Sequence, residues 1–261
     1  MKLKEVIIKK YCLRVNKIEI NDESTDGNVY IVHSNDNKYV LKVYDSFEHA
    51  ISMVDIHNYL SNNDISVPKI LKNSDDKFIT NFDKKYLVLY SFLPGVQLRD
   101  YVSDNDIYKN IAKSVKRMHD VTSGFNKFGL DSIPFLVDDD FDNFSLIHFD
   151  LTNCNIFYDT SFYNYIGFID FDDAKYGPCI IDVAIIISLL FFSKTRGVNK
   201  EGLNIFLKEY YNPLELDKNL PFVKKYALRW IDYVIDNNNF DSSTQDSFII
   251  RRNLIDEFFE E

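Results

Sequence analysis

Short runs of β-branched and aromatic residues dominate the first ninety residues of the chain, and turn-forming polar residues separate them. Such runs predict strands, and the clearest three lie at 29–32, 39–44 and 86–90. One segment differs, because from about 46 to 62 the apolar residues recur at helical spacing. We expect a helix there, with Asp45 and Glu48 as its capping pair.

After Pro94-Gly95 the apolar spacing becomes that of helices. Two stripes recur every three or four positions: Ile107, Ile111, Val115 and Met118, then Phe222, Tyr226, Trp230 and Val234. The segment between them, 144–183, is typical of short strands and tight loops. The pattern therefore predicts an α+β, two-lobed fold. A small β-rich N-terminal lobe would span 1–93 and a larger, mainly helical C-terminal lobe would span 94–261.

Composition narrows the class of protein. The chain has 261 residues, of which 46% are hydrophobic and 27% charged, so it is neither disordered nor collagenous. Its net charge of −10 disfavours nucleic-acid binding, which depends on Lys and Arg contacts to phosphates. An acidic surface suits a cationic small molecule as partner. We expect a monomer or a weak dimer.

Neither a disulfide framework nor a membrane segment is expected. Cys12, Cys154 and Cys179 are odd in number and form no CxxC pair, which favours a reducing compartment without a zinc knuckle. The N-terminus has no signal-peptide pattern. The most apolar stretch, 183–192, is about half the ~18 residues that a membrane span needs, so it predicts a buried core helix. A cytoplasmic location follows.

The chemistry is concentrated in one segment. In His148-Phe149-Asp150-Leu151-Thr152-Asn153-Cys154-Asn155, the carboxylate and the amide stand five residues apart, so one loop can carry both. A second apolar run ends at Asp170. Mg²⁺ in phosphate sites takes few carboxylates, so one Asp and one Asn suit it. His-x-Asp-x₄-Asn followed by an apolar residue and Asp is the pattern that kinase-type phosphoryl transfer requires.

With these residues the chain resembles the aminoglycoside phosphotransferases and their choline-kinase-like relatives, which share the protein-kinase fold. Further fragments occur in the family's order. They are Gly27-Asn28-Val29-Tyr30, Tyr39-Val40-Leu41-Lys42-Val43-Tyr44, Val67-Pro68, Leu89-Tyr90-Ser91-Phe92-Leu93-Pro94-Gly95, Met118-His119, Ile169-Asp170-Phe171-Asp172-Asp173, Gly177-Pro178 and Asp182-Val183-Ala184. The resemblance covers most of the chain. It implies an ATP- and Mg²⁺-dependent phosphotransferase, with GTP as the alternative nucleotide.

The resemblance assigns roles in transfer and metal binding. Asp150 would be the catalytic residue that orients the acceptor hydroxyl and takes its proton. Asn155 and Asp170 would hold Mg²⁺ against the phosphates. Asp182 would anchor the backbone of the catalytic loop.

Other residues would bind the nucleotide. Lys42 would offset charge on the α- and β-phosphates, with Asp55 as its expected acidic partner. Val40 would pack on the adenine ring, and backbone groups of Ser91 and Leu93 would hydrogen-bond its edge.

Several neighbouring residues have a structural interpretation. His148 is expected to brace the loop, with a general base as the alternative, and His119 is expected to be a packing residue. Cys154 is expected to have no chemical role, because nothing nearby would lower the pKa of its thiol. Phe149 departs from the family, which usually has Gly between the His and the Asp of the loop.

The acceptor is expected to be a small molecule. Only eleven residues separate Asp170 from Asp182, too few for the peptide platform of a protein kinase. Two acidic segments are candidates for binding an amine-bearing hydroxyl compound: Asp138, Asp139, Asp140 and Asp142, and Asp256 with Glu257. Solvated surface is the alternative. An aminoglycoside is the first expectation. Choline, homoserine or another metabolite is the alternative, and a catalytically inactive binding protein is the alternative of another class.

Overall fold

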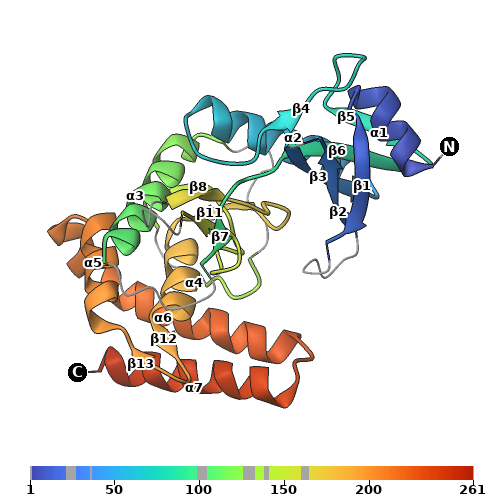
Figure 1. Ribbon diagram of the computed structural model, residues 1–261. Coiled ribbons are helices and arrows are strands. Elements are labelled where there is room, and N and C mark those ends of the chain that lie inside the picture. Colours follow the sequence, from blue (N-terminus) through green and yellow to red (C-terminus); the bar gives the residue numbers. More distant parts are fainter. Residues whose placement is uncertain are drawn as a thin grey trace. The chain divides into compact units, whose positions relative to one another are not determined.

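The structure is a computed structural model (Figure 1) that describes residues 2–21, 28–35, 37–98, 105–125, 133–137, 141–159 and 165–260. The chain forms two compact units, unit 1 over Met1–Pro94 and unit 2 over Gly95–Glu261. Each unit is described by itself.

Unit 1 is built on one antiparallel sheet, in the order β1-β2-β3-β6-β4, with β5 also paired to β6. Its strands are β1 Val15–Ile20, β2 Val29–Ser34, β3 Asn37–Tyr44, β4 Ile70–Leu71, β5 Ile79–Phe82 and β6 Lys85–Ser91. Two helices accompany the sheet, α1 Leu3–Tyr11 and α2 Phe47–Asn62. The three predicted strands and the predicted helix are thus confirmed.

The predicted cap of α2 was wrong by one residue. Ser46, not Asp45, caps the helix, because its Oγ accepts a hydrogen bond from the backbone N–H of His49 at 3.0 Å. Asp45 instead forms an ion pair with Lys85 on β6. A serine and an aspartate are both good N-caps, so their adjacency left the local pattern ambiguous.

The core of unit 1 lies under α1. Ile7 of that helix is fully buried in one cluster with Val32, Leu41, Leu87 and Leu89, which come from the three central strands. In β6 the four residues from Leu87 to Tyr90 are all buried, so both faces of this strand are covered and it reads as a continuous apolar run. The packing fixes the register of β3 and β6, which carry several of the predicted nucleotide residues.

Unit 2 is mainly helical. Its helices are α3 Asn105–Thr122, α4 Ile180–Leu190, α5 Lys200–Tyr210, α6 Pro213–Asn237 and α7 Ser242–Phe258. Short antiparallel pairings join its strands, in the orders β10-β9-β7, β11-β8 and β12-β13. The strands are β7 Val96–Gln97, β8 Phe144–Ile147, β9 Ile156–Tyr158, β10 Tyr165–Phe168, β11 Lys175–Pro178, β12 Phe192–Ser193 and β13 Gly197–Val198.

The first helical stripe predicted from the sequence lies in the core of unit 2, and Tyr226 and Trp230 of the second stripe are buried as well. All four residues of the first stripe are fully buried on α3, and the second stripe lies on α6. The apolar stretch near 183–192 includes most of α4, whose residues from Ile180 to Ser188 are all buried, so the predicted core helix is confirmed. Among the described residues, no helix has the length and hydropathy that a membrane span requires.

Candidate active site

Two small strand pairs position the loop that the sequence singles out. β8 pairs with β11 and ends at Ile147, and the loop 148–155 then leads directly into β9. β9 pairs with β10, which ends just before Ile169. The backbone of Ile169 is bonded on both sides: its N–H donates to Asn155 O at 3.0 Å, and its carbonyl accepts from His148 Nε2 at 2.8 Å. Asp170 therefore follows a residue that is tied to both ends of the loop.

Asp150 and Asn155 are in direct contact. Asn155 Nδ2 donates to the Asp150 backbone carbonyl and to its Oδ2 oxygen, both at 2.8 Å. Because both bonds use the amide nitrogen, a cation would be bound through the other side-chain atom of Asn155, Oδ1. The amide thus sets the orientation of the Asp150 carboxylate.

The carboxylate of Asp150 lies among like charges. Burial is the main cause that raises its pKa to about 7, and the charges of Asp173 and Asp170 raise it further, against the Asn155 hydrogen bond, which lowers it. Asp170 and Asp173 are exposed, whereas Asp150 is half-buried. A cation at this edge of the loop would relieve the repulsion.

The donor atoms suit Mg²⁺ bound together with phosphates. Asn155 and Asp170 offer hard oxygen ligands, and few carboxylates are needed when phosphates supply the remaining ligands. A search of the described residues found no group of three or more His, Cys, Asp or Glu side chains that could hold a metal by themselves. Asn155 and Asp170 fit a metal ion whose remaining ligands are phosphate oxygens.

The start of the loop is clamped by Asp182 on α4. This fully buried carboxylate accepts hydrogen bonds from the backbone N–H of His148 at 2.8 Å and of Phe149 at 2.9 Å. Its Oδ2 also lies 3.0 Å from His119 Nε2. The prediction that Asp182 anchors the loop backbone is confirmed.

His119 is more than the packing residue that the sequence predicted. It is buried on α3, with Nδ1 2.6 Å from the hydroxyl of Tyr210 and Nε2 against Asp182. Burial lowers its pKa, but the charge of Cys179 and the charge and hydrogen bond of Asp182 outweigh that and raise the pKa to about 10. Its partners lie 91 and 63 residues away, so local spacing could not reveal them.

His148 braces the loop, as predicted. Its ring is fully buried and is hydrogen-bonded to the Ile169 carbonyl through Nε2. Burial lowers its pKa, which favours the neutral imidazole. The other ring nitrogen, Nδ1, has no hydrogen-bond partner among the described residues. A buried neutral ring of this kind positions backbone and is not exposed to an acceptor.

Phe149 shows how the loop accommodates a bulky residue where the family has Gly. Its φ is +66°, in the left-handed region that costs a residue with a Cβ about 1–2 kcal/mol. The ring stacks on Phe135 with centroids 5.9 Å apart, and Lys175 Nζ lies 5.2 Å from its centroid. These contacts and the Asp182 hydrogen bond hold the strained backbone.

In unit 1, β3 carries two of the predicted nucleotide residues. Val40 and Lys42 are two residues apart, so they point to the same face of the sheet, and both are half-buried. Lys42 lies opposite Val88 on β6 and Val29 on β2. Asp55 lies on α2 and is half-buried.

The last residue of β6, Ser91, and the segment after it carry the other two. Leu93 is half-buried, and Ser91 is bonded to Lys69: its N–H donates to Lys69 O at 2.7 Å, and its Oγ accepts from Lys69 N at 2.9 Å. The Ser91 N–H is therefore committed, which leaves its carbonyl as the backbone group for an adenine contact. Gly27 lies outside the described residues.

The acidic substrate candidates fall in different places. Asp138, Asp139 and Asp140 lie outside the described residues. Asp142 forms an ion pair with Lys218, and Asp256 pairs with Lys224 at 2.9 Å, where the hydrogen bond from Lys224 lowers the pKa of the Asp256 carboxyl. Glu257 is exposed on α7. Two of these carboxylates are thus already paired with lysines.

Several solved structures have a fold similar to that of this chain. An aminopropanol kinase associated with a microcompartment has a TM-score of 0.72 at 16% identity, and 98% of this chain and 95% of that chain are covered. An aminoglycoside phosphotransferase from Alicyclobacillus acidocaldarius has a TM-score of 0.71 at 12% identity, covering 100% and 95%. The amicoumacin kinase hAmiN has a TM-score of 0.70 at 17% identity, covering 98% and 94%. At these identities the likeness establishes the kinase-like fold, which confirms the predicted fold class.

The sequence itself matches a family model. Residues 17–138 and 136–214 match the model described as the phosphotransferase enzyme family, APH. No curated protein matches the chain. The family match includes the segments that carry Lys42, Asp150, Asn155 and Asp170, and it covers well over half of the chain. The chain therefore belongs to the phosphotransferase enzyme family and is a small-molecule phosphotransferase with a kinase-like fold.

Proposed function

We propose that this enzyme transfers the γ-phosphoryl group of ATP to a hydroxyl group of a small amine-bearing molecule, with an aminoglycoside as the first candidate. The observation that carries the proposal is the Asp150 carboxylate, which is oriented by Asn155 Nδ2 and lies in a loop clamped by Asp182. A carboxylate held in this way can accept a hydrogen bond from an alcohol.

Asp150 would act mainly by positioning. The transition state of phosphoryl transfer is loose, so the acceptor hydroxyl loses its proton late and needs orientation more than a strong base. The raised pKa of the Asp150 carboxyl, caused first by burial and then by the charges of Asp173 and Asp170, also makes it a better proton acceptor. The proton of the alcohol would pass to a carboxylate oxygen of Asp150 as the new O–P bond forms and the bond from the γ-phosphorus to the β–γ bridging oxygen breaks, which releases ADP.

Asn155 and Asp170 would hold Mg²⁺ at the edge of the loop. When bound, the ion would neutralise phosphate charge and offset the repulsion among the carboxylates. Lys42, with Asp55 as its partner, would bind phosphate oxygens. Val40, the Ser91 carbonyl and Leu93 would bind the adenine.

The acceptor class is supported by charge and by the names of similar structures. The net charge of −10 favours a cationic ligand. Similar structures are described as kinases of aminopropanol and amicoumacin and as a spectinomycin phosphotransferase in complex with ADP. One of them was solved with AMP-PNP, which supports ATP as the donor. Asp138, Asp139, Asp140, Asp142, Asp256 and Glu257 remain proposed contacts for the amines.

The test is a panel of nucleotides and acceptors. The protein is incubated with MgATP or MgGTP and with aminoglycosides, choline, homoserine or an amino alcohol, and products are identified by mass spectrometry as phosphate monoesters. Thermal shifts with each nucleotide run in parallel. We expect MgATP to stabilise the protein and at least one aminoglycoside to be phosphorylated. Turnover of choline alone would contradict the aminoglycoside assignment, and the absence of any nucleotide-dependent shift would favour an inactive binding protein.

A further inference from the structure

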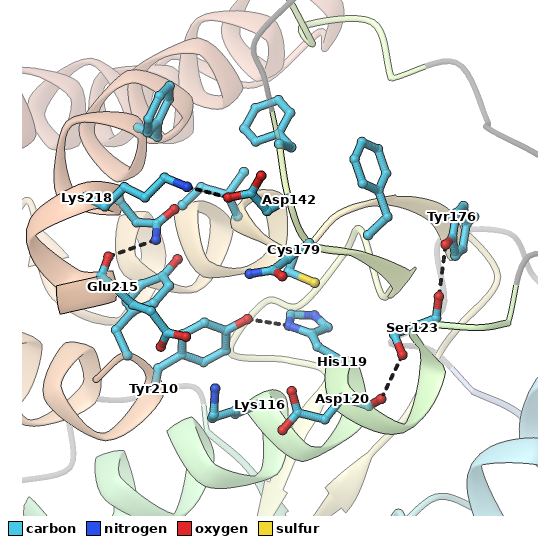
Figure 2. A pocket seen from close by; sticks show the side chains of 17 residues that line it. Lys116, His119, Asp120, Ser123, Asp142, Tyr176, Cys179, Tyr210, Glu215 and Lys218 are labelled. Atoms are coloured by element: carbon cyan, nitrogen blue, oxygen red, sulfur yellow. Dashed lines mark hydrogen bonds and ion pairs between the residues drawn. The ribbon is translucent and has the colours of Figure 1, made fainter. Parts of the chain in front are cut away.

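A cavity of about 780 Å³ opens in unit 2 away from the catalytic loop (Figure 2). Its described walls come from α3, from the segment 141–144 at the start of β8, from β11 and the start of α4, and from the end of α5 and the first part of α6. None of Asp150, Asn155 and Asp170 is among the described residues that line it. Its volume is within the range of small-molecule pockets.

The apolar surface of this cavity is mainly aromatic. The ring centroid of Phe141 lies 6.4 Å from that of Phe144 and 6.1 Å from that of Phe222. All three side chains line the cavity and are half-buried, so part of each remains accessible to a ligand. We call these three residues the aromatic wall. Small-molecule pockets combine such a surface with a few polar groups that orient the ligand.

Several polar side chains of the cavity already have partners. The Tyr210 hydroxyl is bonded to His119, and Lys218 forms an ion pair with Asp142 (Figure 2). The carboxylate of Glu215 caps α6, where it accepts a hydrogen bond from a backbone N–H group. These groups hold the walls together and are not available to a ligand.

The hydroxyl of Tyr211 has no such partner. The residue lines the cavity and is only 7% exposed, yet its hydroxyl makes no hydrogen bond among the described residues. Burial raises the pKa of this hydroxyl, and the charges of Cys179 and Glu215, which also line the cavity, raise it further. The group therefore stays protonated and can donate a hydrogen bond. A buried donor without an acceptor is costly, so an oxygen atom of a ligand would be bound favourably here.

Two charged side chains of α3, Lys116 and Asp120, have no ion-pair partner among the described residues. They are four positions apart, so they lie on the same face of the helix, and both line the cavity (Figure 2). Lys116 Nζ lies 5.6 Å from the centroid of the Tyr210 ring, and the ring centroid of Tyr211 lies 4.6 Å from the same point. An ammonium group and a donor hydroxyl therefore lie near one tyrosine ring, with a carboxylate one helical turn away from the ammonium group.

These groups select the charge of a ligand. A simple anion would pair with Lys116 but would be repelled by Asp120, and a simple cation would pair with Asp120 but would be repelled by Lys116. A molecule that carries both charges close together satisfies both side chains. In an α-amino acid, one carbon atom joins the ammonium and carboxylate groups, which suits two partners that are one helical turn apart.

We propose that the cavity is a second ligand site of this enzyme, and that it binds an α-amino acid with an aromatic side chain. The α-carboxylate would accept hydrogen bonds from Lys116 Nζ and from the Tyr211 hydroxyl. The α-ammonium group would pair with Asp120, and the ring would pack on the aromatic wall, where edge-to-face contacts are favourable. No bond is made or broken in this binding, and the site does not depend on the acceptor of phosphoryl transfer.

The first test measures binding by calorimetric titration without nucleotide. L-Phenylalanine is compared with 3-phenylpropionate, which lacks the ammonium group, and with 2-phenylethylamine, which lacks the carboxylate. We expect saturable binding of L-phenylalanine, with a Kd at least about tenfold lower than that of either analogue, because each analogue leaves one charged side chain unpaired. The absence of saturable L-phenylalanine binding, or equally tight binding of either analogue, would overturn the proposal.

Variants then locate the bound amino acid. Lys116→Gln, Asp120→Asn and Tyr211→Phe each remove one proposed contact, and each should raise the Kd for L-phenylalanine about tenfold. Lys109→Gln is the matched control, because Lys109 is exposed on the same helix and is not among the described residues that line the cavity. A Kd that is unchanged in both Lys116→Gln and Asp120→Asn would place the amino acid elsewhere and would contradict the proposal.

The side chain of the probe tests the aromatic wall. Glycine keeps both charged groups but has no ring, so it should bind at least about tenfold more weakly than L-phenylalanine. Glycine that binds as tightly as L-phenylalanine would exclude the aromatic wall from the site. L-Phenylalanine has no alcohol group, so it cannot be the acceptor of the proposed transfer. These tests therefore succeed or fail independently of the proposed function.

Discussion

Two carboxylates at the loop 148–155 have opposite surroundings: Asp182, which holds the start of the loop, and Asp150, which lies within it. At its start, Asp182 is fully buried and accepts hydrogen bonds from two backbone N–H groups and from His119. Within the loop, Asp150 has as its hydrogen-bond donor the amide of Asn155, from the far end of the loop, and has Asp170 and Asp173 as like charges. Asp182 thus accepts three hydrogen bonds. Asp150 lies in an electrostatic environment that favours the binding of a proton or a cation.

This difference separates structural from chemical roles. A buried carboxylate that accepts hydrogen bonds from several donors is held in place by them. A carboxylate with few donors and nearby negative charges is poised to bind what relieves the repulsion, which is the property of a reactive group. The family resemblance assigned both roles from the sequence, and the surroundings of the two carboxylates give the physical reason for them.

The largest expected effect is on the rate of phosphoryl transfer and comes from Asp150. Asp150→Asn should reduce phosphoryl transfer by about 10²–10⁴-fold because the hydroxyl loses its proton acceptor, while ATP binding and the unfolding transition stay close to wild type. The measurement is the transfer rate to the acceptor that the panel identifies. Asp173→Asn is the matched control, since it removes a neighbouring charge and should lower the rate far less. Undiminished transfer by Asp150→Asn would remove this residue from the reaction.

Substitution of Asp182, which holds the start of the loop, should lower stability. Asp182→Asn replaces an acceptor of three hydrogen bonds by an amide whose NH₂ faces donors, so we expect a loss of about 3–5 kcal/mol in the free energy of unfolding. Denaturant unfolding measures it. Asp232→Asn, which breaks the partly exposed pair with Arg252, should cost less than about 1 kcal/mol. Equal losses for the two variants would contradict the distinction between anchor and surface.

The pH dependence of stability tests the charge on His119. Its pKa is raised from 6.5 to about 10, so its contribution is fully present below pH 6.5 and is lost as the pH rises through about 10. The difference in unfolding free energy between the wild type and His119→Gln should therefore shrink steadily between these two values. Urea unfolding at several pH values measures it. A constant difference across this window would mean that His119 is neutral in the native protein.

The smallest effect concerns the backbone of Phe149, next to Asp150. Phe149→Gly and Phe149→Ala both lose the stack on Phe135, but only Gly adopts a φ of +66° without strain. We expect the Gly variant to be about 1 kcal/mol more stable than the Ala variant, the reverse of their usual order. Comparison of the two denaturation midpoints decides it, and an Ala variant that is as stable as the Gly variant would exclude strain at this position.

Local sequence patterns predicted the fold well. The strands β2, β3 and β6 and the helices α2, α3 and α4 follow from periods that depend only on neighbouring residues. The spacing from His148 to Asn155 also placed the loop chemistry, because Asp150 and Asn155 are close along the chain. Residues that are this close along the chain stay close in the folded protein, so the sequence alone reveals their proximity.

Long-range relations were beyond the sequence. The hydrogen bonds of His119 to Tyr210 and Asp182 join residues far apart in the chain. The bond of Ser91 to Lys69 likewise depends on the pairing of β4 with β6. Nor does residue type reveal the left-handed backbone of Phe149, since the residue is unsuited to it.

Calorimetric titration of ATP into the protein, with and without Mg²⁺, tests the proposed metal–phosphate site most directly. If Asn155 and Asp170 share a divalent ion with the phosphates, Mg²⁺ should tighten ATP binding by at least about tenfold in the wild type, and Asp170→Asn should abolish most of that gain. Asp173→Asn should keep it. Binding of ATP that is equally tight without Mg²⁺, or a Mg²⁺ effect that survives in Asp170→Asn, would contradict the site described here.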